Sequence, residues 1–181
     1  GVLDSAIVRY NNNILSLQSS LKYVGQQPDT LSQEVKNLIV QIKFKNSNLR
    51  NEALGSINSS NKFQFLKNDA VTELIAQYPT ELNTYKIQEI KIGNIVDNRL
   101  KPVLEKYISL VDVLPDENAN YNHIKTFGKE SNYTDLLNSR EYQNMIIDQL
   151  LQSQIQLTIG KNLRKKTETL AIKLKQELNS S

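Results

Sequence analysis

Residues 91–114 read KIGNIVDNRLKPVLEKYISLVDVL, and this stretch decides the fold class that the sequence predicts. Its apolar residues follow one another at alternating steps of four and three, the spacing that keeps side chains on one face of an α-helix. The members of this seam are Val96, Leu100, Val103, Tyr107, Leu110 and Leu114. A helix with one narrow apolar face packs lengthwise against other helices, so we expect the rest of the chain to fold against it.

The first residues of the chain show the same heptad spacing. Its members are Leu3, Ile7, Tyr10, Ile14, Leu17, Leu21 and Val24. A helix of this length is marginal alone, and Asn11–Asn13 have poor helix propensity, so it needs a partner helix. Gly25 and Pro28 then predict its end.

A second helix is predicted to follow at once. Thr30 and Gln33 match the capping box that opens many helices. The apolar face expected for it consists of Leu31, Val35, Leu38, Ile42 and Leu49. Because the connection to the first helix is short, we expect the two to form an antiparallel hairpin over residues 1–57, ended by the loop GSINSSN at 55–61.

The middle of the chain leaves alternatives open. One helix is expected to end before Pro79 and another to begin at Thr80. Residues 85–96 mix two-residue and three-residue apolar steps, so they fit a helix or a strand; in the strand reading, residues 90–92 would pair with residues 63–65. Pro102 lies inside the seam, which predicts either a helix that starts near Asn98 or a longer helix kinked at the proline.

The C-terminal part predicts a polar loop at 115–131 and one long helix at 134–178. Gly160 is the expected point of a break or bend in that helix. Apolar residues are dense before Gly160, which indicates core, and thin to a seam after it, which indicates an extension. We therefore expect a hairpin at 1–57, a central bundle at 58–160 and a basic helical extension at 161–181.

Composition supports an all-α chain. Six Gly and four Pro in 181 residues are too few for a many-stranded fold, and with 7% aromatics and no Trp a core would be filled by Leu, Ile and Val. The fold class predicted is an elongated helical bundle, or antiparallel coiled-coil hairpins, with a long C-terminal helix. The chain has no Cys, which excludes disulfides and thiolate metal sites. With no apolar run of about 18 residues either, we expect an intracellular protein of the cytoplasm or nucleus.

Positive charge is concentrated near the C-terminus. Residues 161–178 hold six basic and two acidic residues, a net +4, whereas the whole chain carries +3. A cluster of this kind binds phosphates, acidic filament tails or anionic lipids, or it is simply a solvated face that opposes the helix dipole. The candidate polyanion-binding residues are Lys161, Arg164, Lys165, Lys166 and Lys173.

Catalytic chemistry has little support in the sequence. The single histidine, His123, lies in the polar loop near Asp116 and Glu117, without the spacing of a metal site. A small helical enzyme or ligand binder would have to use these residues. We expect no cofactor, no metal, no catalytic residue and no small-molecule substrate.

Heptad seams interrupted by loops, without cysteine or catalytic motifs, are similar to coiled-coil subunits of tethering, kinetochore and spindle complexes. This resemblance of class rests on no specific motif and transfers no residues. It implies a non-enzymatic scaffold or adaptor subunit that pairs with other helical subunits, as a homo- or hetero-oligomer. The residues predicted to form the protein interface are Leu3, Ile7, Tyr10, Ile14, Leu17, Leu21, Leu163, Leu170 and Leu174.

Overall fold

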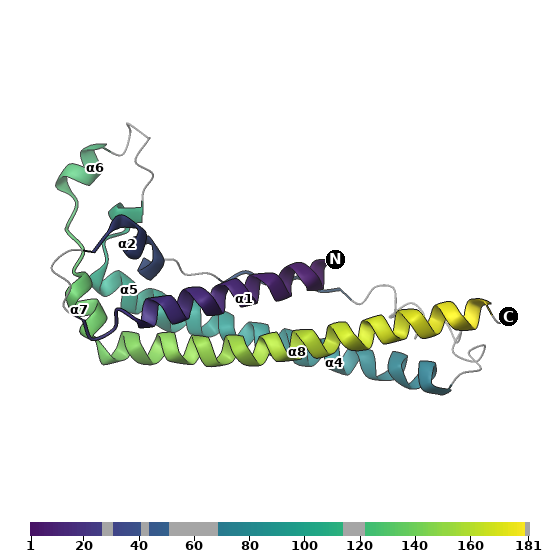
Figure 1. Cartoon of the computed structure of the whole chain (residues 1–181). Coiled ribbons are helices and arrows are strands. Elements are labelled where there is room, and N and C mark those ends of the chain that lie inside the picture. The colour runs from purple at the N-terminus through teal and green to yellow at the C-terminus, as the bar shows by residue number, and fades with distance from the viewer. Residues whose placement is uncertain (27–30, 41–43, 51–68, 114–121, 180–181) are drawn as a thin grey trace. The chain divides into compact units, whose positions relative to one another are not determined.

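A computed structural model describes residues 1–26, 31–40, 44–50, 69–113 and 122–179, and 84% of these are helical, with no strand among them (Figure 1). The chain is all-α, as predicted. Its helices are α1 (Val2–Leu21), α2 (Gln33–Val40), α4 (Asp69–Ile95), α5 (Lys101–Tyr107), α6 (Asn122–Phe127), α7 (Tyr133–Asn138) and α8 (Arg140–Asn179), with a π-helical turn η2 (Val96–Leu100) and a 3-10 turn η3 (Leu110–Val113).

The chain divides into two compact units. Unit 1 comprises Gly1–Asn11, Asn46–Ile90 and Gln154–Ser181, and unit 2 comprises Asn12–Lys45 and Lys91–Ser153. Each of the long helices α1, α4 and α8 contributes to both units. This division differs from the expected segments 1–57, 58–160 and 161–181, because each unit gathers pieces from distant parts of the sequence.

The core of unit 2 forms around the first half of the seam predicted at residues 96–114. Val96, Leu100 and Val103 are at most 4% exposed, as their spacing predicts. Leu100 and Val103 belong to a buried cluster with residues of α7 and the start of α8. Its most buried members are Leu100, Leu136, Leu137 and Tyr142.

The last part of this seam is not buried as the spacing predicts. Leu110 is 62% exposed, because the helix stops at Tyr107 and Ile108 takes an extended conformation with φ −107° and ψ 128°. Its N–H still donates to the Leu104 carbonyl at 2.7 Å, which closes the last turn. Leu114 lies outside the described residues.

Pro102 is accommodated by the π turn that precedes it. The N–H of Lys101 donates to the carbonyl of Val96, five residues back, and Pro102 occupies the first turn of α5. A proline there needs no N–H donor of its own. The expected irregularity near Pro102 is therefore a widened helical turn at 96–100.

The core of unit 1 is built from α4 and the C-terminal part of α8. Val71, Ile75 and Leu170 form one buried cluster, and a second forms around Leu82, Tyr85 and Leu163. Partly buried side chains that pack against the second cluster include Leu3 of α1, Tyr78 of α4, Ile159 of α8 and Leu49.

Gly160 does not break α8, contrary to the expectation. It is buried, and a Cβ atom there would lie 3.3 Å from a ring carbon of Tyr85 and 3.5 Å from Ile7 Cγ1. The glycine lets neighbouring side chains approach the helix closely, and packing offsets the cost of about 1 kcal/mol that glycine carries in a helix. Low helix propensity was therefore the wrong basis for predicting a bend.

Two other predicted boundaries are wrong. Pro79 lies inside α4, which runs unbroken from Asp69 to Ile95. The strand reading of residues 85–96 is wrong for the same reason, and residues 63–65 lie outside the described part. Conversely, the single helix expected at 134–178 is divided at Ser139, whose extended backbone separates α7 from α8 and whose hydroxyl accepts the N–H of Tyr142 at 3.4 Å.

The second predicted helix is much shorter than expected. Helix α2 covers only Gln33–Val40, and the hydroxyl of Ser32 accepts the N–H of Val35 at 3.3 Å. The predicted cap, Thr30, lies outside the described residues. Residues 44–50 are not helical. Ser47 is buried, Leu49 is partly buried, and Asn46, Asn48 and Arg50 are exposed. The segment turns at Asn48, whose φ is 52° and whose N–H donates to Asn46 Oδ1 at 2.7 Å.

Candidate functional site

The residues predicted to bind a partner are all buried or partly buried. On α1, Tyr10, Ile14 and Leu17 are buried, and Leu3, Ile7 and Leu21 are partly buried. On α8, Leu163 and Leu170 are buried, and Leu174 packs against the Val71 cluster. Five of these nine side chains are therefore buried, and the other four keep part of their surface exposed; their place in a partner interface stays a prediction.

A different row of aliphatic side chains is exposed on α8. Ile147, Leu151 and Ile155 are 44%, 51% and 46% exposed, and they recur at four-residue steps along three successive turns of this helix. The sequence had indicated core for this region, because apolar residues are dense before Gly160. We call Ile147, Leu151 and Ile155 the α8 row. Side chains at this spacing form one apolar stripe on a helix surface.

The residues beside the α8 row are uncharged or ion-paired. Asn144, Gln154 and Thr158 lie on the same exposed side of the helix and carry no charge, and Asp148, which follows Ile147, is ion-paired with Arg99 at 2.6 Å. Covering an apolar stripe with another apolar surface costs little desolvation free energy when its polar neighbours are uncharged or already paired. The row is therefore suited to helix packing.

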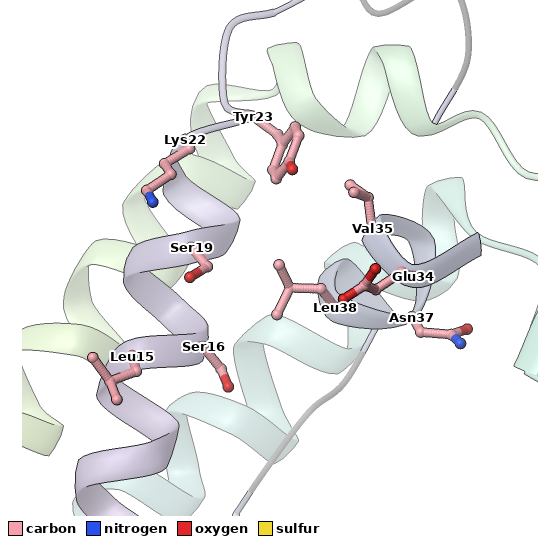
Figure 2. A pocket seen from close by; sticks show the side chains of 9 residues that line it. All are labelled: Leu15, Ser16, Ser19, Lys22, Tyr23, Glu34, Val35, Asn37 and Leu38. Atoms are coloured by element: carbon pink, nitrogen blue, oxygen red, sulfur yellow. The ribbon is translucent and has the colours of Figure 1, made fainter. Parts of the chain in front are cut away.

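Unit 2 contains a surface cleft of about 650 Å³ between the end of α1 and α2 (Figure 2). Leu15, Tyr23, Val35 and Leu38 supply its apolar lining, and the polar lining residues are Ser16, Ser19, Lys22, Glu34 and Asn37. Figure 2 shows Tyr23 and Leu38 directed into the space, while Lys22 and Asn37 point away from it. This lining can hold an apolar side chain, but it does not bring a nucleophile together with a base.

A carboxylate is buried inside unit 1. Glu89 has no exposed surface, and it accepts hydrogen bonds from the Tyr10 hydroxyl at 3.1 Å, the Ser47 N–H at 3.1 Å and the Ser47 hydroxyl at 2.9 Å. We call Glu89, Tyr10 and Ser47 the Glu89 cluster. Three donors satisfy the hydrogen-bonding needs of a buried carboxylate. The cluster therefore joins α1, α4 and the 46–50 segment by hydrogen bonds.

The electrostatics of the Glu89 cluster favour a proton that stays on the tyrosine. Burial, and then the charge of Glu89, raise the pKa of Tyr10 well above its usual range. Nearby, the Gln156 side chain donates to the backbone carbonyl of Tyr85 at 3.3 Å, so α8 is joined to α4 in the same unit. Sequence reasoning missed this cluster, although Glu89 continues the apolar spacing of Leu82 and Tyr85.

The basic residues predicted to bind a polyanion separate into two kinds. Arg164 bonds to Asp4 and, at 2.9 Å, to Glu168, and Lys166 bonds to Glu81. The Gly1 amino group and Arg164 hold the pKa of Asp4 below its usual value, and Asp4 in turn raises the pKa of Arg164.

Three candidate lysines remain. Lys161 and Lys165 are exposed and form no ion pair with the described residues. Lys173 is partly buried. Of the predicted cluster, two ammonium groups are thus both exposed and uncompensated within the described chain.

The structure places His123 at the surface, beside Phe127. The side chain is exposed, and its ring lies 4.8 Å from that of Phe127, measured between centroids. Asp116 and Glu117, its predicted neighbours, lie outside the described residues. Within the described residues, no three side chains of His, Cys, Asp or Glu converge as a metal site requires.

No protein-family model, curated protein or solved structure matches this chain. Within the described residues, no helix combines the length with the hydropathy that a membrane span requires.

Proposed function

We propose that the chain is a non-enzymatic scaffold or adaptor subunit that binds another helical protein chain through the α8 row. One observation carries this proposal: Ile147, Leu151 and Ile155 leave about half of each aliphatic side chain in contact with water over three turns of one helix. Exposed apolar stripes of this kind mark protein interaction surfaces. A partner helix can pack its own apolar side chains against residues at four-residue spacing.

The proposal keeps the function expected from the sequence and changes the surface. The seam residues that predicted an interface are buried or partly buried, whereas the residues of the α8 row are exposed. Coiled-coil-like pairing and oligomerisation are part of the proposal, with a complex of the cytoplasm or nucleus as its setting, since a cysteine-free composition favours a reducing compartment.

Sedimentation velocity over a range of concentrations tests this function. We expect the purified chain to associate and the Leu151→Glu variant to sediment as a monomer, because a charge in a packed helix interface is costly to desolvate. Ala171→Glu, at an exposed position farther along the same helix and away from the α8 row, is the matched control and should leave association unchanged. A wild-type chain that stays monomeric at all concentrations, and that loses no partner from a native complex on Leu151→Glu substitution, would contradict the proposal.

A further inference from the structure

A second surface lies wholly within unit 1, where the first turns of α1 meet α8. It is a groove of about 410 Å³. Ile7 and Val8 supply its apolar part, and Val8 is 57% exposed. Lys161 and Lys165 line the same groove. The groove therefore places an open aliphatic surface next to two ammonium groups.

The charges in the groove are not balanced. Asp4 and Glu168 both bond to Arg164, so the two carboxylates of the groove are engaged by its guanidinium. Lys161 and Lys165 form no ion pair with the described residues, and they are four residues apart on one helix. Residues four apart lie on the same side of a helix, about 6 Å from each other. The uncompensated charge is thus a pair at helical spacing.

We propose that this groove binds an acidic amphipathic helix of a partner protein. Two carboxylates four residues apart on that helix would face Lys161 and Lys165, and an aliphatic side chain between them would pack on Val8. Charge complementarity at helical spacing fixes the register, and the apolar contact adds affinity. This inference goes beyond the proposed function, because it concerns a different surface and a partner of stated chemistry.

The chemistry of the groove favours a carboxylate-bearing helix over a nucleic acid. Arginine binds phosphate best through its bidentate guanidinium, and here Arg164 is engaged by Asp4 and Glu168. Ile7 and Val8 offer a sugar-phosphate chain no favourable contact, whereas they match an aliphatic side chain.

Fluorescence anisotropy with the full chain tests the proposal. The probe is a labelled 14-residue alanine-based helical peptide with two Glu four residues apart and a Leu between them, and the comparison peptide carries Lys in place of both Glu. We expect the acidic peptide to bind, with an affinity that falls with salt, and the comparison peptide not to bind. The double variant Lys161→Glu and Lys165→Glu should weaken binding at least tenfold.

The matched control reverses two other exposed lysines, Lys86→Glu and Lys91→Glu on α4, and should leave peptide affinity within about twofold. Circular dichroism checks that each variant is folded. Leu151→Glu should also leave peptide binding unchanged, so failure here is distinguishable from failure of the α8 row. Absence of binding at millimolar peptide, or equal loss in both double variants, would overturn the inference. So would tighter, lysine-dependent binding of an oligonucleotide or of anionic vesicles.

Discussion

The hydroxyl of Tyr10 donates a hydrogen bond of 3.1 Å to the carboxylate of Glu89, a residue 79 positions away in the sequence. Ser47 binds the same carboxylate through its N–H and its hydroxyl. One buried anion thus connects α1, α4 and the irregular segment at residues 46–50 within unit 1. A buried carboxylate is costly unless hydrogen-bond donors satisfy it, so the loss of any one donor is expected to destabilise the whole unit.

Replacing Tyr10 by Phe should destabilise the protein. The ring remains, but Glu89 loses one donor, and hydrogen bonds to charged groups contribute about 1.5–3 kcal/mol. We expect the free energy of unfolding, measured by urea denaturation, to fall by about 2 kcal/mol. An unchanged urea midpoint would show that the Glu89 cluster does not contribute to stability.

Replacing Tyr142 by Phe should have the opposite or no effect. The Tyr142 side chain is fully buried in unit 2, and its hydroxyl has no hydrogen-bond partner among the described residues. Removing an unsatisfied hydroxyl relieves a desolvation cost of about 1–3 kcal/mol while the apolar ring is kept. The same urea experiment should show equal or greater stability, and a clear loss would indicate a hydroxyl that is bonded in solution.

Replacing Gly160 by Leu should destabilise unit 1. The glycine lies against Tyr85 and Ile7, and any larger side chain would have to displace the buried Tyr85 ring. Overpacking of this kind costs about 1–3 kcal/mol, which exceeds the gain of about 1 kcal/mol in helix propensity. Thr158→Leu, two residues earlier at an exposed position, is the control. A thermal melt in which both variants behave alike would contradict the close packing at Gly160.

Alkaline conditions should unfold the chain as its buried tyrosines ionise. Burial, and then the charge of Asp112, raise the pKa of Tyr133 to about 12, and burial raises the pKa values of Tyr10, Tyr85 and Tyr142. Because these folded-state values exceed the unfolded value near 10, the stability contribution is complete below about pH 10. It is lost as the pH rises toward the folded-state values.

Absorbance at 295 nm measures this directly. In 8 M urea all eight tyrosines should titrate together near pH 10, whereas in buffer a part of the absorbance change should appear only with loss of the helical circular dichroism signal. Ionisation of all eight tyrosines near pH 10 in the folded chain would contradict the burial of these four.

The sequence predicted the helical class and much of the buried set, because both follow from periodicity. Steps of four and three correctly identified Tyr10, Ile14 and Leu17 as one face of α1, and Val96, Leu100 and Val103 as another buried face. Periodicity reports which side chains lie together on a helix. It does not report whether the surface that covers them belongs to the same chain, which is why buried residues were expected at a partner interface.

The remaining errors came from local rules that packing overrides. Pro79 and Gly160 lie inside long helices because tertiary contacts offset their low propensity. The residues of the α8 row were expected in the core, because in a helix with many apolar residues the sequence does not distinguish the buried side from the exposed side. Ser47 is buried only because Glu89, 42 residues away, accepts its hydrogen bonds, and no short-range pattern signals such a pairing.

The π turn at Val96–Leu100 gives this chain a place where its length can change. A π turn holds about one residue more than an α turn, so five residues there complete nearly the rotation that four complete elsewhere. Removal of one exposed residue, such as Asn98, would let the turn close as ordinary α-helix while Val103 and Leu104 keep their orientation. A single-codon deletion here should keep the later side chains in their core positions, whereas the same deletion in the middle of α4 would rotate every later side chain away from its core position. The cost at the π turn is that Pro102 would then lie inside a regular α-helix, which destabilises the helix by about 3 kcal/mol.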